Sequence, residues 1–468
     1  MQYPYTDRAN SIALGYRDAP LSQRYGRLIS CSLPCNGLSL TGFLAAAEGQ
    51  QRFYWESPSG LLAFAGMGAA VELTAWGDER YQKIAASARE LFADSHLAGA
   101  ANPLSGPRLF GGFAFRGDFT PDNTWSIYAP AFFVLPHYQL VSRSGQMWLT
   151  INTQIPPEES AAALIPDLLA ALRQKIIQLR AADSSAPAKR QSELRGINYP
   201  MSYRIWQRMI EAATDRIRAG ELNKVVLARA AELRFAEPVQ LLPVLQHLGT
   251  HYAECYRFLF EPRPRFAFYG ASPELLANVQ GVRFSTMALA GSIGRSATST
   301  EDRRLSQRLL NSQKDRYEQQ IVVDKMRDRL SPLAQSLQIA PTELLKLSNI
   351  QHLQTPLSGR LKRATGVLPL VEALHPTPAL GGDPRPDALR LIRKLEPIPR
   401  GWYGAPIGTI DSRLEGEFAV AIRSAVAQES RAWVYAGAGI VADSQPMPEW
   451  EETELKFQPM LDAHGSLS

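Results

Sequence analysis

Two short segments of the chain each place two carboxylates three residues apart. Asp315 and Glu318 lie in QKDRYEQQIVVDKM, and Glu449 and Glu452 lie in EWEETELKF. Residues three apart share one face of an α-helix. Two such pairs on separate helices can converge on one hard cation such as Mg²⁺, which prefers oxygen ligands and keeps positions open for water and an anionic substrate.

Each pair also has a simpler interpretation. Glu318 shares its helix face with Ile321 and Val322, and a carboxylate buried without a partner is costly, so an ion pair with one of the arginines would also account for it. The second pair would also fit a solvated, charged helix. In the metal interpretation, Lys456 lies one turn after Glu452 and faces the same ligand.

A lysine and a glutamate have the sequence context of a base and an acid. Lys224 lies in LNKVVLAR, where the β-branched run predicts a buried strand, and a buried amine has a lowered pKa and can act as a general base. Glu274 in GASPELL precedes Leu275 and Leu276, and apolar surroundings raise the pKa of a carboxyl group so that it can act as an acid. The alternatives are a strand-end lysine with its ammonium in water and a turn or capping carboxylate.

The segment GAGIVA, Gly437 to Ala442, matches the dinucleotide-binding pattern G-x-G-x-x-A. That site requires a helix to begin at the glycine turn, whereas Pro446 and Pro448 follow and predict a helix start no earlier than about Pro448. We therefore disfavour a dinucleotide site. The glycines fit a tight strand end, or backbone N–H groups that bind a carboxylate.

The elements that position these residues are of mixed type. Helical spacing predicts four long helices, the second capped by Ser202 and stopped by Gly220, over residues 158–180, 202–220, about 301–330 and about 448–461. Strand-like runs include KVVLARAAEL, YRFLFE, FAFYGA, GVRFSTMALAG, FAVAIRSAV and RAWVYAGAGIV. Because these strands come in groups and do not alternate regularly with helices, we expect a mainly antiparallel α+β fold and not a doubly wound sheet.

Composition places the chain among ordinary globular proteins. It has 468 residues, 45% of them hydrophobic and 20% charged, and a net charge of +5, which excludes global disorder, collagen and coiled coil. There is no block of five like charges, so we expect no nucleic-acid partner, and the small positive excess suits a small anionic substrate. The most apolar stretch, residues 60–71, is about half as long as the ~20 residues of a membrane span.

The cysteines and the N-terminus indicate a cytoplasmic protein with no membrane partner. Cys31, Cys35 and Cys255 are odd in number and do not make a disulfide framework. The first residues, MQYPYTDRANS, lack the apolar core of a signal peptide. A reduced compartment fits both observations.

Seven motifs, taken together and in order, resemble one family. LNKVVLAR, GASPELL, ALAGS, KDRYEQQIVVD, HPTPALGG, GEFAVAIRS and GAGIVADSQPMPEWEETELKF follow one another within residues 198–463. This series is similar to the chorismate-utilising enzymes, and among them most to the isochorismate synthases. In the N-terminal part, GGFAF at 111–115 and Trp125 are also similar to the family.

The resemblance implies a fold and a division of the chain. The fold would be that of anthranilate synthase component I, an α+β fold with two large stacked antiparallel sheets and helices outside. Residues 1–180 would be a divergent N-terminal part of this fold, 181–196 an exposed loop or linker, and 197–468 the catalytic chorismate-binding region.

Individual residues decide which reaction the resemblance implies. Relatives that use ammonia, such as anthranilate and aminodeoxychorismate synthases, have a non-basic residue at the position of Lys224, whereas a lysine there goes with water as the nucleophile. No glutaminase subunit is therefore expected. Ala379 and Leu380 are the small and branched apolar pair of isochorismate synthases, and salicylate synthases tend to have a threonine near Ala379. Because salicylate synthases share the lysine, they remain an alternative.

The resemblance also bears on the pathway. LKFQPMLDA near the C-terminus and the PALGG run are more similar to the synthases of menaquinone biosynthesis. An isochorismate synthase that supplies a catecholate siderophore is the other alternative.

The family's chemistry assigns a role to each candidate residue. By resemblance, the enzyme would be an isomerase in which Lys224 deprotonates the water that attacks ring carbon 2 of chorismate, and Glu274 protonates the hydroxyl that leaves ring carbon 4. The enolpyruvyl carboxylate would be bound by Arg423 and the 437–439 amides. The full set of implied substrate contacts is Gly291, His352, Thr377, Ala379, Leu380, Arg423, Gly437, Ala438, Gly439 and Lys456.

The resemblance implies Mg²⁺ as the cofactor. Glu318 and Glu452 would bind it, with Asp315 and Glu449 nearby, and the metal would bind the ring carboxylate. A dianionic substrate needs such a cation together with basic donors.

Overall fold

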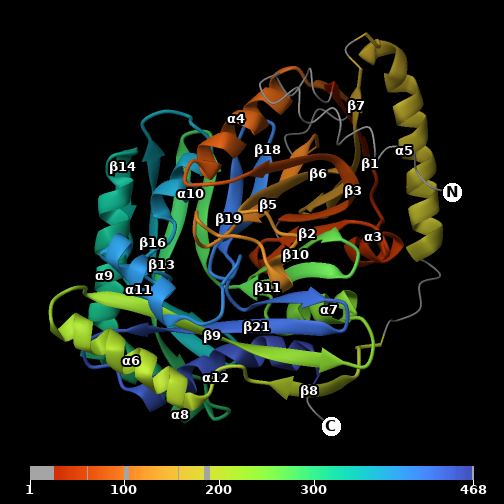
Figure 1. Ribbon diagram of the computed structural model, residues 1–468. Coiled ribbons are helices and arrows are strands. Elements are labelled where there is room, and N and C mark those ends of the chain that lie inside the picture. The colour runs from red at the N-terminus through yellow and green to blue at the C-terminus, as the bar shows by residue number, and fades with distance from the viewer. Residues whose placement is uncertain (1–25, 61, 100–104, 157, 184–189, 466–468) are drawn as a thin grey trace.

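The computed structural model describes residues 26–60, 62–99, 105–156, 158–183 and 190–465. In these ranges the chain forms ten α-helices and 21 strands, with the helices arranged around the outside of the strands (Figure 1). None of the helices in the described part of the chain is long and apolar enough to cross a membrane.

The strands of the described ranges form one continuous hydrogen-bonded network. They are antiparallel, except that β1 (Arg27–Pro34) pairs in parallel with β4 (His96–Gly99). Two long strands, β3 (Leu62–Ala75) and β6 (Ala131–Arg143), pair with each other and join two runs of strands. β6 also pairs with β7 (Gln146–Ile155), which in turn pairs with β1.

The first run starts from β6 and the second from β3. In order of pairing, the first run is β5 (Arg108–Phe113), β18 (Pro406–Asp411), β19 (Gly416–Val420), β12 (Leu275–Gln280), β13 (Arg283–Gly294) and β16 (Ile350–Leu361), with β14 (Ala334–Ile339) and β15 (Glu343–Lys346) on β16. The second run is β2 (Arg52–Glu56), β10 (Tyr256–Arg263), β11 (Phe266–Ser272), β20 (Ser424–Gln428), β21 (Arg431–Ile440) and β9 (Lys224–Phe235), with β8 (Leu194–Asn198) and β17 (Gly382–Asp383) on β9.

Aromatic side chains from both runs meet between them. The ring of Phe110 in the first run lies 6.4 Å from that of Phe53 and 5.9 Å from that of Phe260 in the second run, measured between centroids. Trp402 stacks on Phe260 at 5.2 Å, and all four side chains are buried. The two runs are therefore two layers around one core, so the expected stacked antiparallel sheets are confirmed, with the layers continuous through β3 and β6.

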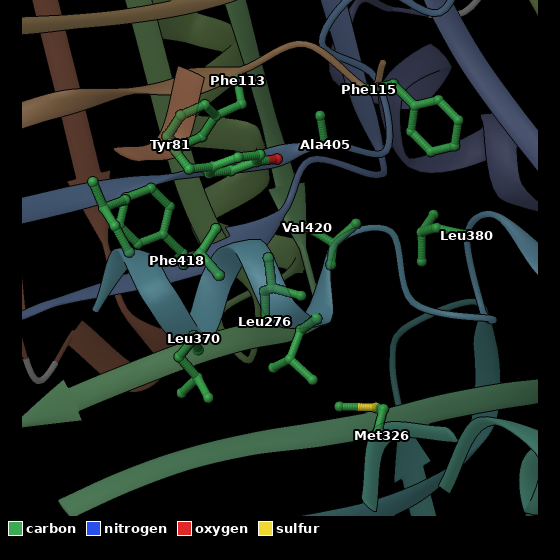
Figure 2. Close-up of a cluster of buried hydrophobic side chains, with 14 of the residues drawn as sticks. Tyr81, Phe113, Phe115, Leu276, Met326, Leu370, Leu380, Ala405, Phe418 and Val420 are labelled. Carbon is green, nitrogen blue, oxygen red and sulfur yellow. The ribbon is translucent and has the colours of Figure 1, made fainter. Parts of the chain in front are cut away.

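Helices cover the outer faces of the two layers. Against the first run pack α4 (Arg80–Ala93), α9 (Gln313–Leu330) and α10 (Leu368–Leu374), and against the second run pack α3 (Leu40–Ala46), α7 (Leu241–His251) and α12 (Pro446–Ala463). α5 (Ala161–Asp183) packs against β1 and β7. Around β9 and β13 lie α6 (Tyr203–Arg218), α11 (Arg385–Leu395) and α8 (Ser299–Asn311). A buried hydrophobic cluster lies between the first run and its helices. In it, Tyr81 of α4 stacks on Phe113 at 4.1 Å, with Leu370 of α10 and Phe418 of β19 nearby (Figure 2).

The first two predicted helices agree closely with the structure. The range predicted as 158–180 forms α5, and Ser202 caps α6 by accepting a hydrogen bond from the backbone N–H of Ile205 at 3.4 Å. The chain leaves this helix at Gly220, where φ is +78°, a left-handed conformation that glycine adopts without strain.

The other two helix predictions need correction. The single helix expected over about 301–330 is wrong, because the chain forms α8 and α9 with a break at Ser312, whose hydroxyl accepts a hydrogen bond from the Asp315 N–H and starts a new helix. The start expected near Pro448 is also wrong, since α12 begins at Pro446. Both prolines lie in the first turn, where the N–H groups have no intrahelical partner to lose.

The predicted division of the chain stays a prediction. Residues 184–189, within the expected loop 181–196, lie outside the described residues. The parts of the chain before and after this loop are joined by strand pairing, since β2 pairs with β10 and β5 pairs with β18. Strands from residues 1–180 and from residues 197–468 therefore lie in both layers.

Candidate active site

Most of the predicted site residues line one cavity at the ends of β9 and β21. Eleven of them belong to its walls: Glu274, Gly291, Glu318, His352, Ala379, Leu380, Arg423, Gly437, Gly439, Glu452 and Lys456. Lys224 contacts this group from the first position of β9. Thr377 is buried two residues before Ala379. Ala438, between the lining residues Gly437 and Gly439, points away from the cavity lining and is buried in the hydrophobic cluster of Tyr81 and Phe113.

Lys224 is held at the start of β9 and is buried. Next to it, Asn223 donates hydrogen bonds from its backbone and its side chain to Asp383 of β17, the latter at 2.7 Å. The lysine side chain is 1% exposed, and its Nζ lies 2.7 Å from Oε1 of Glu318. The amine is therefore in a dry site beside a carboxylate, and the water-exposed alternative does not apply.

Glu274 is the second buried titratable group at this cavity. Its backbone N–H donates to the Ser272 hydroxyl at 3.2 Å, and its carbonyl accepts from the Val420 N–H at 3.0 Å, which fixes the turn between β11 and β12. Burial raises the pKa of the Glu274 carboxyl to about 8, against the opposing positive charges of two lysines and Arg423. At neutral pH this carboxyl group is mostly protonated and can donate a proton.

The four carboxylates of α9 and α12 lie around two adjoining cavities that share Glu452. Glu318 and Glu452 line the first, while Asp315, Glu449 and Glu452 line the second. Burial and the charge of Glu452 raise the pKa of Glu449 to about 7. Burial also raises the pKa of Asp315, and the charge of Glu318 adds to this. The two helices therefore gather negative charge at one place, as their spacing predicted.

Lysines pair with three of these carboxylates. Lys224 pairs with Glu318, Lys456 with Glu452 at 2.5 Å, and Lys314 with Glu449 at 3.1 Å. Glu318 therefore has a lysine partner, and not the arginine of the simpler interpretation.

The donor set has the chemistry of a magnesium site. In the described part of the chain, no three His, Cys, Asp or Glu side chains lie close enough as they stand to bind one metal ion. The four carboxylates nevertheless line the two adjoining cavities and supply only oxygen donors. Oxygen donors are the ligands that Mg²⁺ prefers.

Basic side chains line the same cavity as Glu318 and Glu452. Arg423 is buried with φ +49°, and its Nη2 lies 3.4 Å from Nε2 of His352. Burial and the charges of Arg423 and Lys456 hold the pKa of His352 well below its usual range, so this ring is neutral, and Ser292 Oγ lies 2.9 Å from its Nδ1. Among the described residues, Arg423 Nε and Thr377 Oγ1 are buried without a hydrogen-bond partner. Since Arg423 lines the cavity, a ligand bound there can satisfy its Nε.

The glycines of β21 bring backbone close to the carboxylates. β9 pairs with β21 up to Ile440, whereas β20 pairs with it only up to Val434, so the other edge of β21 has no strand partner beyond that point in the described chain. Lys456 Nζ donates to the Gly437 carbonyl at 2.9 Å. A Cβ at Gly439 would lie 2.5 Å from Glu318 Oε1, so any larger residue here would displace the Glu318 side chain. Since α12 begins only at Pro446, no helix starts at the glycines, and they do not form a dinucleotide site.

Two polar lining residues were missed by the sequence analysis. Tyr403 borders the cavity and stacks on Tyr435 at 5.2 Å, and burial raises its pKa to about 12. No spacing pattern distinguishes this tyrosine from other core aromatics. Ser292 lies beside Gly291 in the quoted ALAGS motif and pairs with His352 in the β13–β16 ladder, so the motif itself contained the signal.

Comparisons with known proteins identify the family of the chain. The chain matches the family described as "Chorismate binding enzyme" over residues 16–465. It is 39% identical over 418 residues to the "Salicylate biosynthesis isochorismate synthase" of Pseudomonas aeruginosa, covering 88% of this chain and 85% of that protein. It is 35% identical over 438 residues to "Isochorismate synthase MenF" of Bacillus subtilis, covering 92% and 91%.

Solved structures show the same architecture. The menaquinone-specific isochorismate synthase MenF of Escherichia coli superposes with a TM-score of 0.75 at 26% identity, covering 93% of this chain and 94% of that chain. Anthranilate synthase component I of Streptococcus pneumoniae superposes with a TM-score of 0.70 at 21% identity, covering 86% and 93%. This second match shows that the fold expected from the sequence is correct.

Proposed function

The chain belongs to the family of chorismate-binding enzymes, and from this premise we propose that it isomerises chorismate to isochorismate. Water adds at ring carbon 2, the ring double bonds shift, and the hydroxyl of ring carbon 4 leaves. The same atoms are present in substrate and product, so the reaction consumes one proton and releases one. It needs one base and one acid, and no redox partner.

The observation that supports this proposal most is a buried amine and a buried, protonated carboxyl group at one cavity. Lys224 takes the proton of the attacking water, and Glu274 gives a proton to the departing hydroxyl. The pKa of about 8 keeps Glu274 protonated at neutral pH, so that it begins the forward reaction as the acid. In the reverse direction the two groups exchange roles.

The basic side of the cavity fits the enolpyruvyl carboxylate of the substrate. Arg423 has an Nε without a partner among the described residues, and the β21 edge at Gly437–Gly439 adds backbone groups. Lys456 lies beside this edge, His352 lines the same cavity, and Thr377 is buried two residues before Ala379. Charged and backbone donors in a dry site bind an anion more strongly than they do in water.

Mg²⁺ fits the carboxylates of this cavity, where Glu318 and Glu452 would bind it with Asp315 and Glu449 nearby. When bound, the ion neutralises the charge of the ring carboxylate and helps to orient the ring. Burial raises the pKa values of Asp315 and Glu449, and the charges of Glu318 and Glu452 add to this, so a cation among these carboxylates would stabilise their charged forms.

The nucleophile and the product follow from two positions. In this family a lysine at the position of Lys224 accompanies water as the nucleophile. We therefore propose that the enzyme acts without ammonia and without a glutaminase subunit. Ala379 and Leu380 line the cavity and offer no polar group to hold the enolpyruvyl arm over the ring. Isochorismate is therefore released before it loses pyruvate. Salicylate synthesis is the second candidate.

We propose that isochorismate made by this enzyme enters menaquinone biosynthesis in the cytoplasm. The similarity to the menaquinone-specific enzyme of Escherichia coli supports this use, whereas the name of the Pseudomonas aeruginosa relative refers to salicylate. Cys31, Cys35 and Cys255 are buried and unpaired, which fits a reduced compartment. Deletion of the gene, followed by measurement of menaquinone and of salicylate-derived products, separates the two uses.

The test of the reaction is a product analysis. Purified protein, chorismate and Mg²⁺ are incubated without ammonia, and the products are separated by chromatography beside a control without enzyme. We expect isochorismate with little pyruvate. Stoichiometric salicylate and pyruvate, or an aminated product, would contradict the proposal.

The metal is tested separately. A chelator should abolish turnover and added Mg²⁺ should restore it, while Glu318→Gln and Glu452→Gln should each lose most activity with an unchanged circular dichroism spectrum. Near-normal turnover of either variant at low Mg²⁺ would exclude these two residues as ligands.

A further inference from the structure

A buried ion pair lies behind the cavity wall. Arg400, in the loop between α11 and β18, and Glu396, at the end of α11, have side chains that are 4% and 5% exposed. Arg400 Nε lies 2.9 Å from Glu396 Oε2, and Nη2 lies 2.5 Å from Oε1. Neither residue lines the cavity, and no motif in the sequence distinguished them.

The pair takes the place of a strand along β9. On the edge of β9 away from β21, β17 pairs only with Lys224 and Val225, and β8 pairs only from Glu232 onward. In the gap between them, the Val226 carbonyl accepts from Arg400 at 2.7 Å, and the Ala228 N–H donates to Glu396 at 2.8 Å. Two side chains thus satisfy the backbone groups that a neighbouring strand would otherwise satisfy.

The same guanidinium group also contacts the neighbouring loop that contains Ala379 and Leu380. Arg400 Nη1 donates to the Leu380 carbonyl at 2.9 Å, and the Val226 N–H donates to the Gly381 carbonyl at 3.0 Å. The ring of Phe115 lies 4.3 Å from the guanidinium carbon. The strand that begins with Lys224 and the loop with Ala379 and Leu380 therefore meet at one side chain.

We propose that Arg400 and Glu396 are positioning residues for the reaction, an inference that rests on the proposed function. They fix the separation between the strand of Lys224 and the wall formed by Ala379 and Leu380, and so align the substrate ring with the base. A planar guanidinium group can bond to two carbonyls and a carboxylate at once, which a single ammonium group on a flexible stem cannot do with the same geometry.

The experiment compares Arg400→Lys with a matched buried pair elsewhere. Arg52 and Glu261 also form a buried ion pair at 2.5 Å, on β2 and β10, and neither lines the cavity. We expect Arg400→Lys to lower kcat by about 10- to 100-fold, as misplacement of about 1 Å can do, with a smaller change in KM. Arg52→Lys should lower Tm to a similar extent and leave kcat unchanged. Glu396→Gln retains an acceptor for the Ala228 N–H, so its kcat should fall less than that of Arg400→Lys.

Three outcomes would overturn the inference. They are an Arg400→Lys variant with wild-type kcat, equal losses of kcat in Arg400→Lys and Arg52→Lys that follow Tm, and a crystal structure of Arg400→Lys in which the Leu380 backbone keeps its distance from Val226. The crystal structure does not depend on activity. If the wild type converts chorismate into another product, the proposed function fails, and the same variants are compared on that product.

Discussion

At the scale of single residues, the chemistry depends on two groups whose environments differ. Glu274 is surrounded by protein, and burial outweighs the positive charges around it. Lys224 is equally buried but has a carboxylate partner in Glu318. The site can therefore keep a neutral acid close to an amine without the two forming an ion pair of their own.

Glu274→Gln should remove the acid and abolish the pH dependence that its titration causes. The variant should slow the reaction in both directions, because one acid–base pair serves both. In the wild type, the forward rate should fall as pH rises through about 8, where Glu274 loses its proton. Rate profiles from pH 6 to 9.5 for the wild type and the variant test this, and an unimpaired variant would assign the acid role to another group.

The same substitution should stabilise the fold at high pH. The pKa of Glu274 in the folded protein is raised from 4.5 to about 8, so its contribution to stability is full below the unfolded pKa and is lost as pH rises through the folded pKa. Glutamine has no such loss. The difference in Tm between variant and wild type should therefore grow from pH 5 to pH 9, and a constant difference would contradict the raised pKa.

Lys224→Ala should lower the rate by about 10²–10⁴-fold, the usual contribution of a general base. Steady-state kinetics with saturating Mg²⁺ measures this, and Lys83→Ala, a lysine exposed on α4, is the control. A loss below threefold with an unchanged pH profile would show that Lys224 is only structural.

The residue types of the site could be predicted from the sequence, but their partners could not. The β-branched run around Lys224 and the leucines after Glu274 indicate burial, because such residues are found in cores. The contact of Lys224 with Glu318 joins a strand to a helix far along the chain, and no local spacing encodes it. Arg400 and Glu396 were missed for the same reason, since their partners are backbone groups of β9 and of the loop at Leu380.

At the scale of elements, α9 and α12 bring their carboxylates, and β21 its glycine backbone, to the same cavity. The spacing of the carboxylates correctly predicted their shared faces, while the helix limits were wrong at Ser312 and Pro446 because capping and first-turn geometry were not considered. The break at Ser312 has a consequence for the site. Its hydroxyl accepts a hydrogen bond from the Asp315 N–H, so Asp315 lies in the first turn of α9 and Glu318 follows in the next turn.

Gly439→Ala tests how closely β21 must approach α9. The added Cβ would lie 2.5 Å from Glu318 Oε1 and 3.0 Å from Lys224 Cε, so the Lys224–Glu318 pair must move. We expect activity to fall by on the order of 10²-fold with a small change in Tm. Gly196→Ala on β8 is the matched control, because a Cβ there meets nothing within 4 Å. Wild-type kinetics for Gly439→Ala would show that the approach is not required.

At the scale of the whole molecule, the two layers are built from both parts of the chain. β5 adds to the first layer beside β18, and β2 adds to the second beside β10. This interleaving could not be predicted from residue patterns, because each long-range pairing depends on which edges remain free after the others have formed. The motifs of the site all lie after residue 197, yet the core beneath them includes Phe53 and Phe110 from before it.

The division at 181–196 should therefore not separate independent units. A fragment of residues 197–468 would expose the edges of β10 and β18 and the apolar faces of Phe260 and Trp402, which pack in the core that also contains Phe53 and Phe110. Unpaired edges and large apolar patches promote aggregation. We expect this fragment to aggregate when produced alone and to become soluble when residues 1–196 are co-expressed with it, with size-exclusion chromatography and chorismate turnover as the measurements. A monomeric, active 197–468 fragment would show instead that the catalytic region folds by itself and that the N-terminal strands only cover it.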